Sequence, residues 1–177
     1  VQTCALPISR TFNNLTLNRA GQSLVLGNPL ITNVYTQTNG NVNINGTLLT
    51  LNGVITFPSS ISNGAFVGSL TSSLSITGNG VITNALLMSQ TNSTTRSLYD
   101  LLLNRTGQTL NIGNALEIRN SITPTLGSIT TGGFVTLKSD AVRSAMVGVV
   151  AGAITGNLNV ESFAPGGFTG WTNLGPS

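Results

Sequence analysis

Charge is the scarcest property of this 177-residue chain. Only 6% of its residues are charged, with seven basic against four acidic side chains, whereas soluble domains carry roughly 25%. Histidine is absent, which excludes every catalytic scheme that uses an imidazole as its general base. The basic residues are dispersed and aromatic residues are few, so the chain lacks the basic patch that nucleic-acid binding needs. We therefore expect no nucleic-acid partner.

Acidic residues are sparse and far apart. The four, Asp100, Glu117, Asp140 and Glu161, are separated by at least 17 positions. Glycoside hydrolysis needs a close pair of carboxylates, and a calcium loop needs several within one segment. The chain shows neither pattern, nor a lysine-containing phosphate loop. We expect no enzymatic activity, no cofactor and no metal ion, and we interpret Asp140, close to Arg143, as part of a polar turn.

Long apolar runs are missing as well. The longest, residues 145–154, falls short of the ~20 residues that a membrane span requires, so we interpret it as a buried strand pair. Strong helix formers such as Glu and Lys are scarce, whereas β-branched residues, Asn and Gly abound. The composition predicts an all-β protein with an aliphatic core and no membrane span in this segment.

What the chain has in quantity is self-similarity. Residues 14–30 return 86 positions later as residues 100–116, with ten of the 17 positions identical. Such repetition indicates a chain built by stacking copies of one structural unit. The second copy begins near residue 96. Repeat proteins are typically scaffolds or binding surfaces whose length is their working property.

Short apolar triplets alternate with turn residues within each copy. Leu15-Thr-Leu17 precedes Gly21, and Leu110-Asn-Ile112 precedes Gly113. This spacing is typical of half-buried strands, and Gly and Asn allow sharp turns between them. Two architectures fit: a parallel β-solenoid with coils of roughly 20–25 residues, and tandem antiparallel β-sandwiches joined by Asn-Gly hairpins. The strands are too short for a sandwich, so we predict the solenoid. The side chains expected in its core are Leu15, Leu17, Leu24, Leu26, Leu101, Leu103, Leu110 and Ile112.

The two ends differ from this body in composition. Residues 1–8 contain the only cysteine, Cys4, and resemble the translation of a common sequencing adapter, so we exclude them from functional reasoning. Residues 161–177 contain the only Trp and are interpreted as the start of a following module. The solenoid is therefore expected over residues 9–160. Trp171 and Phe168 are the only candidate stacking platform for a sugar.

Four phrases in the body carry a family resemblance: Asn14–Arg19, Ser72–Gly78, Gly107–Leu110 and Thr131–Ser139. With them the chain resembles repeat regions of large secreted surface proteins of Bacteroidota. Such proteins are typically exported by the type IX secretion system through a C-terminal sorting domain. The resemblance implies an extracellular or outer-membrane location and a monomeric part of a longer chain.

Arg19 and Arg105 occupy equivalent places in the two copies, each followed by Gly-Gln after one residue. One interpretation makes them ligand contacts repeated along a face. The other, which we favour, is a turn arginine that hydrogen-bonds carbonyl groups of the next coil.

These observations favour a non-enzymatic stalk or spacer of an adhesin-like bacterial protein. The alternative is a carbohydrate- or surface-binding module that uses a solenoid face or the aromatic C-terminal segment. Its partners would be glycans or host and environmental surfaces, reached through the intact protein.

Overall fold

The apolar triplets of this chain form strands, and the Gly- and Asn-containing segments between them form turns. The computed structural model describes residues 10–149 and 151–164, and this part of the chain is all β, without a helix. Its strands are β1 (Arg10–Val25), β2 (Leu30–Asn43), β3 (Leu48–Leu51), β4 (Ile55–Thr56), β5 (Phe66–Val67), β6 (Ser73–Ile76), β7 (Ile82–Thr83), β8 (Ser97–Asn111), β9 (Leu116–Thr130), β10 (Val135–Leu137), β11 (Met146–Val147), β12 (Ala153–Thr155) and β13 (Leu158–Val160).

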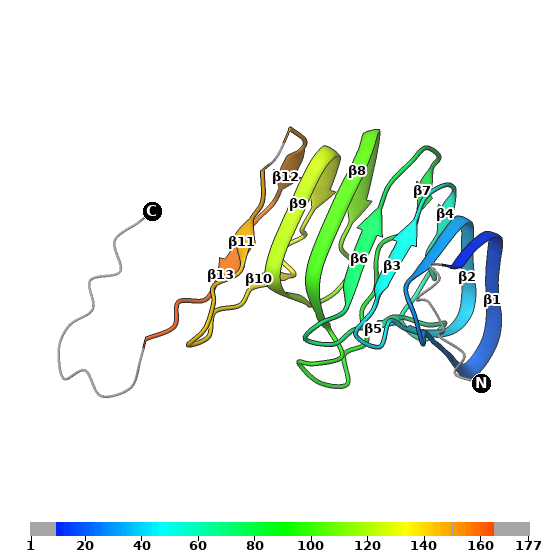
Figure 1. Cartoon of the computed structure of the whole chain (residues 1–177), viewed down its shortest axis with the longest axis horizontal. Helices are drawn as coiled ribbons and strands as arrows, with labels where there is room; N and C mark the ends of the chain where they lie inside the picture. The colour runs from blue at the N-terminus through cyan, green and yellow to red at the C-terminus, as the bar shows by residue number, and fades with distance from the viewer. Residues whose placement is uncertain (1–9, 150, 165–177) are drawn as a thin grey trace, which may run out of the picture.

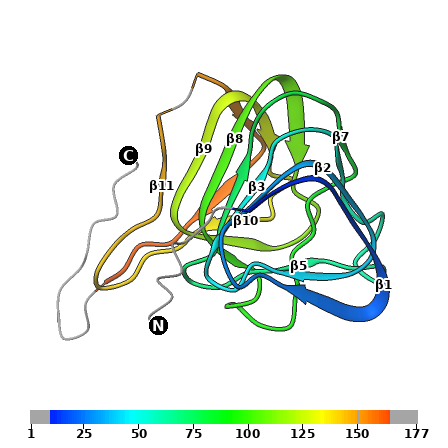
Figure 2. The same ribbon diagram turned by 45° about the vertical axis from the view of Figure 1, so that its right-hand side comes forward.

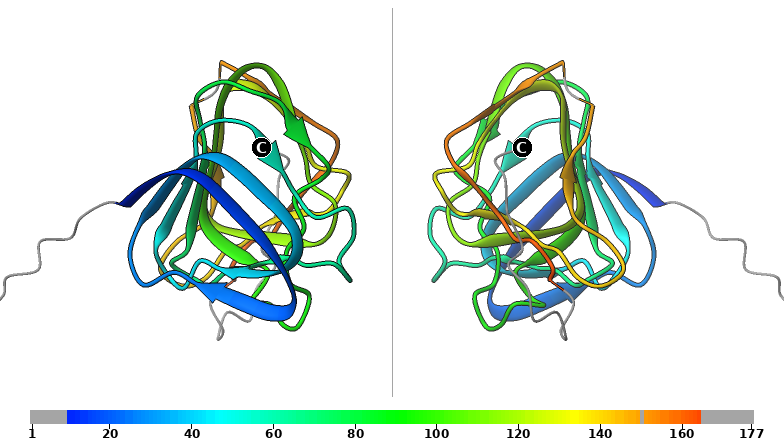
Figure 3. Two further views of the ribbon diagram at one scale, coloured as in Figure 1. Left: turned by 90° about the vertical axis from the view of Figure 1, so that its right-hand side faces the viewer. Right: turned by 90° about the vertical axis from the view of Figure 1, so that its left-hand side faces the viewer.

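Every named strand pairs in parallel with strands of the neighbouring coils, which confirms the predicted β-solenoid and rules out the antiparallel sandwich. The chain makes about seven turns. The coils are stacked along the long axis, with β1 at one end and β11–β13 at the other (Figure 1). Viewed along that axis, the coils overlie one another around a common interior (Figure 3). No helix long and apolar enough to span a membrane occurs in the described part of the chain.

One column of stacked residues shows the coil length. Leu30, Leu49, Leu74, Leu101 and Ile122 are successive partners across β2, β3, β6, β8 and β9. The steps between them are 19, 25, 27 and 21 residues, taken directly from these numbers. The expected coil of 20–25 residues is therefore close to the observed one, and the longer coils carry the outer loops at residues 57–65 and 89–96.

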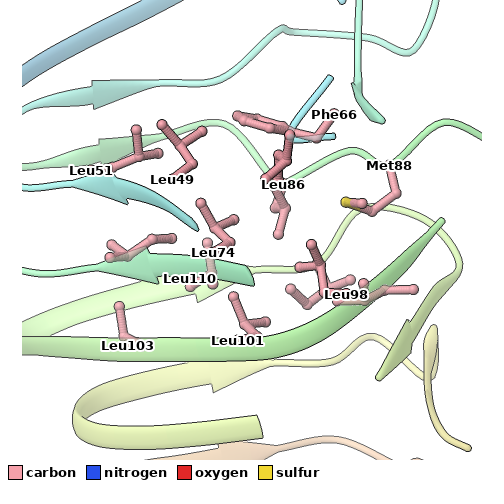
Figure 4. Close-up of a cluster of buried hydrophobic side chains, with 14 of the residues drawn as sticks. Leu49, Leu51, Phe66, Leu74, Leu86, Met88, Leu98, Leu101, Leu103 and Leu110 are labelled. Atoms are coloured by element: carbon pink, nitrogen blue, oxygen red, sulfur yellow. The ribbon is translucent and has the colours of Figure 1, made fainter. Parts of the chain in front are cut away.

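The core lies inside the coils, because alternate residues of each strand point inward. Figure 4 shows leucines of β3, β6 and β8 meeting Phe66, Leu86 and Met88 in this interior. Among the predicted core residues, those of the second copy and Leu26 are buried, whereas Leu15, Leu17 and Leu24 of the end strand β1 are only partly buried. Burial of an aliphatic side chain contributes about 1.5–3 kcal/mol, so this continuous stack is the main source of stability.

Outward-facing Asn side chains form a second, polar stack. The Asn33 amide donates to Asn13 at 3.3 Å, the Asn52 amide donates to Asn33 at 3.2 Å, and the Thr77 hydroxyl donates to Asn52 at 3.1 Å. Equivalent polar side chains in successive coils therefore satisfy one another, which explains the Asn-rich composition.

Four strands are longer than the triplets predicted. β1, β2, β8 and β9 have 14–16 residues because pairing continues around a corner of the coil (Figure 2). The corner is a bulge after Leu17 in β1 and after Leu103 in β8, 86 residues later. We call residues 18–22 and 104–108 the first and second Asn-Arg corners.

The apolar run 145–154 corrects one prediction. It does form two strands, β11 and β12, but Met146 and Val149 are 58% and 93% exposed rather than buried. The reason is position: among the described residues these strands pair only with β9, and no further coil covers them. Composition predicted the strands, but their burial depends on a neighbouring coil.

Candidate functional site

Charged side chains gather in the second half of the solenoid. Glu117 in β9 is buried, and its carboxylate accepts hydrogen bonds from Arg96 Nε and Arg119 Nη2, both at 2.8 Å. Lys138 Nζ lies 3.9 Å from the same carboxylate and also pairs with Glu161. Opposite charges thus alternate over successive coils in what we call the charge ladder (Arg96, Glu117, Lys138, Glu161).

The charge ladder follows from the coil length. Its members are 21, 21 and 23 residues apart, close to one coil, so stacking brings each beside the next. Leu116 and Ile118 point into the core, which turns the Glu117 side chain outward beneath its partners. Because this carboxylate is shielded from water and held by two guanidinium groups, removing one partner would leave a poorly solvated charge.

A groove of about 440 Å³ lies beside the charge ladder, between Tyr99 of β8 and the loop after β10. Arg143 Nη1 donates to the Tyr99 hydroxyl at 2.6 Å, and its guanidinium lies 5.2 Å from the ring centroid. This cation–π contact fixes Arg143 against Tyr99, and Arg119 lines the same opening. The groove is lined by Leu70, Thr71, Tyr99, Arg119, Asp140, Val142 and Arg143.

Asp140 is part of a polar turn, as the sequence predicts. Its Oδ1 accepts the backbone N–H groups of Val142 at 2.8 Å and Arg143 at 3.0 Å. These two hydrogen bonds, with a smaller contribution from the Arg143 and Arg119 charges, lower the pKa of Asp140 from 3.8. A carboxyl group with a lowered pKa is a poor proton acceptor at neutral pH, so the geometry assigns Asp140 to the loop structure.

Asp100 is also occupied by structural partners. Its Oδ1 accepts hydrogen bonds from the Asn120 amide at 2.7 Å and the Ser121 hydroxyl at 2.6 Å, both in the following coil. Among the described residues, no group of three or more His, Cys, Asp or Glu side chains is placed to hold a metal ion.

Arg105 of the second corner is 1% exposed and reaches across two coils. Its guanidinium donates to the carbonyl oxygens of Gly80 at 3.0 Å and Leu51 at 3.2 Å, and also to that of Gly53. Burial lowers the pKa of Arg105 below its ordinary value, yet a guanidinium stays charged at neutral pH. Its Nε has no hydrogen-bond partner among the described residues.

The turn-arginine interpretation therefore holds for Arg105, with one correction. The carbonyl groups belong to the two preceding coils, not to the next one. Two of the three acceptors are glycines, Gly53 and Gly80, and a Cβ at either would meet the backbone of a neighbouring residue, Asn33 or Val54. Arg19, the equivalent residue in β1, is exposed at the end of the stack.

No protein-family model matches this chain, and neither a curated protein nor a solved structure matches it significantly. The family resemblance of the repeat therefore stays a prediction. The function must be argued from the geometry of the solenoid itself.

The sequence-predicted sugar platform, Trp171 and Phe168, lies outside the described residues, as do residues 1–8. Sequence reasoning missed both the charge ladder and the groove at Tyr99. A signal for the charge ladder was present, since residues of opposite charge recur at close to one coil length. The groove had no such signal, because its residues come from separate coils.

Proposed function

We propose that this chain is a non-enzymatic spacer segment of a bacterial surface or secreted adhesin-like protein, located outside the cell or on the outer membrane. The observation that carries this proposal is that each copy of the sequence repeat adds a fixed length to the solenoid. The second copy, beginning at residue 96, enters the stack four coils after the first. Adding a copy therefore extends the rod without changing its cross-section.

The dimensions suit a spacer. Parallel coils stack ~4.8 Å apart, so seven coils span roughly 34 Å and each 86-residue copy adds roughly 19 Å. The polar stack, the charge ladder and Arg105 all connect successive coils along the rod axis. The four carboxylates described above are each bound to neighbouring protein groups, which favours a structural role for them.

An inserted copy tests the proposal. Residues 10–95 are duplicated between Thr95 and Arg96, so that the new junction repeats the natural one. Small-angle X-ray scattering should show a maximum dimension about 19 Å longer, with an unchanged cross-section. A scrambled insert of the same composition serves as the control. Growth of only a few ångströms in length, as in a compact globule, would refute the spacer.

The groove at Tyr99 favours a second candidate function, binding of a sugar chain that carries carboxylate or sulfate groups. Arg119 and Arg143 supply guanidinium donors there, and Val142 and Leu70 supply exposed apolar surface beside the Tyr99 hydroxyl. This arrangement of polar donors beside apolar surface suits a sugar ring with an acidic substituent.

Titration calorimetry with oligogalacturonate tests this second candidate. Binding should be measurable for the unmodified chain and lost in Arg143→Ala, which removes one guanidinium from the groove. Arg19→Ala removes the same charge far from the groove and should leave the affinity unchanged. Equal affinity in all three chains, or no binding in any, would exclude the groove as a sugar site.

A further inference from the structure

The β1 end of the solenoid presents one edge of a long strand. β1 pairs with β2 along one side, and along its other side it pairs with no strand among the described residues. Phe12 and Val25 are 45% and 54% exposed, and they border a hollow that leads to the partly buried Leu15 and Leu24. A strand of 16 residues with an open edge and an apolar border is a ready template for another strand.

The opposite end also presents strand edges, those of β11, β12 and β13. β13 pairs with β10 alone, and β11 and β12 pair with β9 alone, among the described residues. Val147 and Val160 are exposed there. Because the named strands are all parallel, only a head-to-tail arrangement of two chains continues the hydrogen-bonding pattern from one end to the other.

The chain itself shows how the β1 sequence receives a coil. β8 repeats β1 with the same corner bulge, and it stacks on β6 of the preceding coil through Leu101–Leu103. Arg105 then binds carbonyl groups of that coil and of the coil before it. Arg19 has the same sequence context and follows the same bulge, although its corner lies in a different column of the stack, and it is exposed to solvent.

The two ends of the solenoid are complementary in charge. Arg10 and Arg19 are the only charged residues between positions 10 and 95, so the β1 end is purely basic. At the other end, the charge ladder finishes on Glu161, which pairs with Lys138 and whose side chain remains 43% exposed within the described part of the chain. A basic residue supplied by a second copy would continue the alternation of charge.

From these observations we propose that the β1 end of one chain stacks on the β11–β13 end of a second copy, in parallel, with Arg19 reaching carbonyl groups of the neighbouring chain. Such a heterologous contact does not close on itself, so association produces linear, open-ended assemblies. This proposal goes beyond the spacer function and differs from the sequence-based expectation of a monomer, which stays a prediction. Its failure would leave the length test above unaffected.

The hydrogen-bonding pattern identifies a residue that blocks this edge alone. Outward-facing residues donate their backbone N–H to the preceding coil, as Ser73 does to Thr47 and Lys138 does to Ile118. Thr16 lies outward between Leu15 and Leu17, so its N–H points to the open edge rather than to β2. Thr16→Pro removes that donor and keeps the β1–β2 pairing, since proline is tolerated at a strand edge.

Sedimentation velocity over a range of concentrations is the first measurement, on the full chain. The unmodified chain should form a concentration-dependent series of linear species, while Thr16→Pro stays monomeric with the same circular dichroism and melting temperature. A monomeric unmodified chain at all concentrations, or equal association of the proline variant, would overturn the proposal.

Mixing the two chains tests the polarity of the contact. Fluorescently labelled Thr16→Pro still offers its β11–β13 end, so it should enter assemblies of the unmodified chain and shorten them as a terminator. In a head-to-head contact between two β1 edges the labelled chain would stay monomeric, and that outcome would also overturn the proposal.

Arg19 variants provide a test that does not depend on the proline substitution. Arg19→Ala should weaken the apparent dissociation constant roughly tenfold, since hydrogen bonds from a charged group are lost at the contact. Arg19→Lys keeps the charge but lacks the planar guanidinium group. Its apparent dissociation constant should lie between those of the unmodified chain and Arg19→Ala. Unchanged association in Arg19→Ala would remove Arg19 from the contact and contradict the assignment.

Discussion

The two Asn-Arg corners have nearly the same sequence but different surroundings. At the second corner other coils precede the strand, and Arg105 is buried against three carbonyl groups of the two preceding coils. In the first corner Arg19 lies at the end of the stack and is exposed. The local backbone is alike in both, since the bulges and the left-handed Gly21 and Gly107 recur. A neighbouring coil therefore determines burial and hydrogen bonding, whereas the corner itself is set locally.

The largest difference in stability between the two copies is expected when an inward-facing leucine is replaced by a charged residue. Leu103→Asp buries an uncompensated carboxylate where the side chain is fully buried, and should cost about 4–5 kcal/mol in the free energy of unfolding. The equivalent Leu17→Asp, at a partly buried position, should cost about 1–2 kcal/mol. Urea denaturation measures both. Equal losses would show that the end coil is packed as tightly as the interior.

Removing each corner arginine should give the next largest contrast. Arg105→Met leaves three carbonyl groups without their donor and should destabilise by about 2–3 kcal/mol, even though a costly buried charge is also removed. Arg19→Met in the monomeric Thr16→Pro background should change stability by less than about 0.5 kcal/mol. Thermal melts compare the two, and a neutral Arg105→Met would mean that the carbonyl groups find other partners.

Glycine substitutions should instead behave alike in both copies. A Cβ at Gly40 would collide with the Arg19 carbonyl, and a Cβ at Gly127 would collide with the Arg105 carbonyl, so alanine at either should cost about 2–3 kcal/mol. A Cβ at Gly21 or Gly107 meets open space, and only the left-handed φ of 70° or 69° opposes it, at about 1 kcal/mol. Unfolding free energies that differ between copies would contradict local control of the corner.

The smallest expected effect is the dependence of stability on acidic pH. All four acidic side chains lie in the second half of the chain. The pKa of Asp140 is lowered in the folded state, so its contribution to stability is present above the unfolded value near 3.8 and disappears as pH falls through the folded pKa. A carboxyl titration followed by NMR should place the Asp140 midpoint below 3.8. A midpoint at or above that value would mean that the turn does not hold the carboxylate.

Much of the fold was predictable from particular residues. The Leu-x-Leu triplets predicted strands, and the 86-residue repeat predicted stacking. The predicted core positions of the second copy are confirmed as buried: Leu101, Leu103, Leu110 and Ile112. The candidate site was less predictable. Tyr99 and Arg143 are 44 positions apart, so no local sequence pattern indicates that they meet.

The sequence by itself determined the strand period, the corners and the coil length, because these depend on alternation and on Gly and Asn within a few residues. The tertiary structure decided how the copies are rotated against each other. The column from Arg10 through Leu30, Leu49 and Leu74 reaches Leu101 after 91 residues rather than 86, so Leu15 and its repeat partner Leu101 lie in different columns. The physical reason is that loop lengths differ between coils, so the rotation accumulates along the stack. Burial of Arg105, and exposure of Arg19, then follow from which coil comes before each corner.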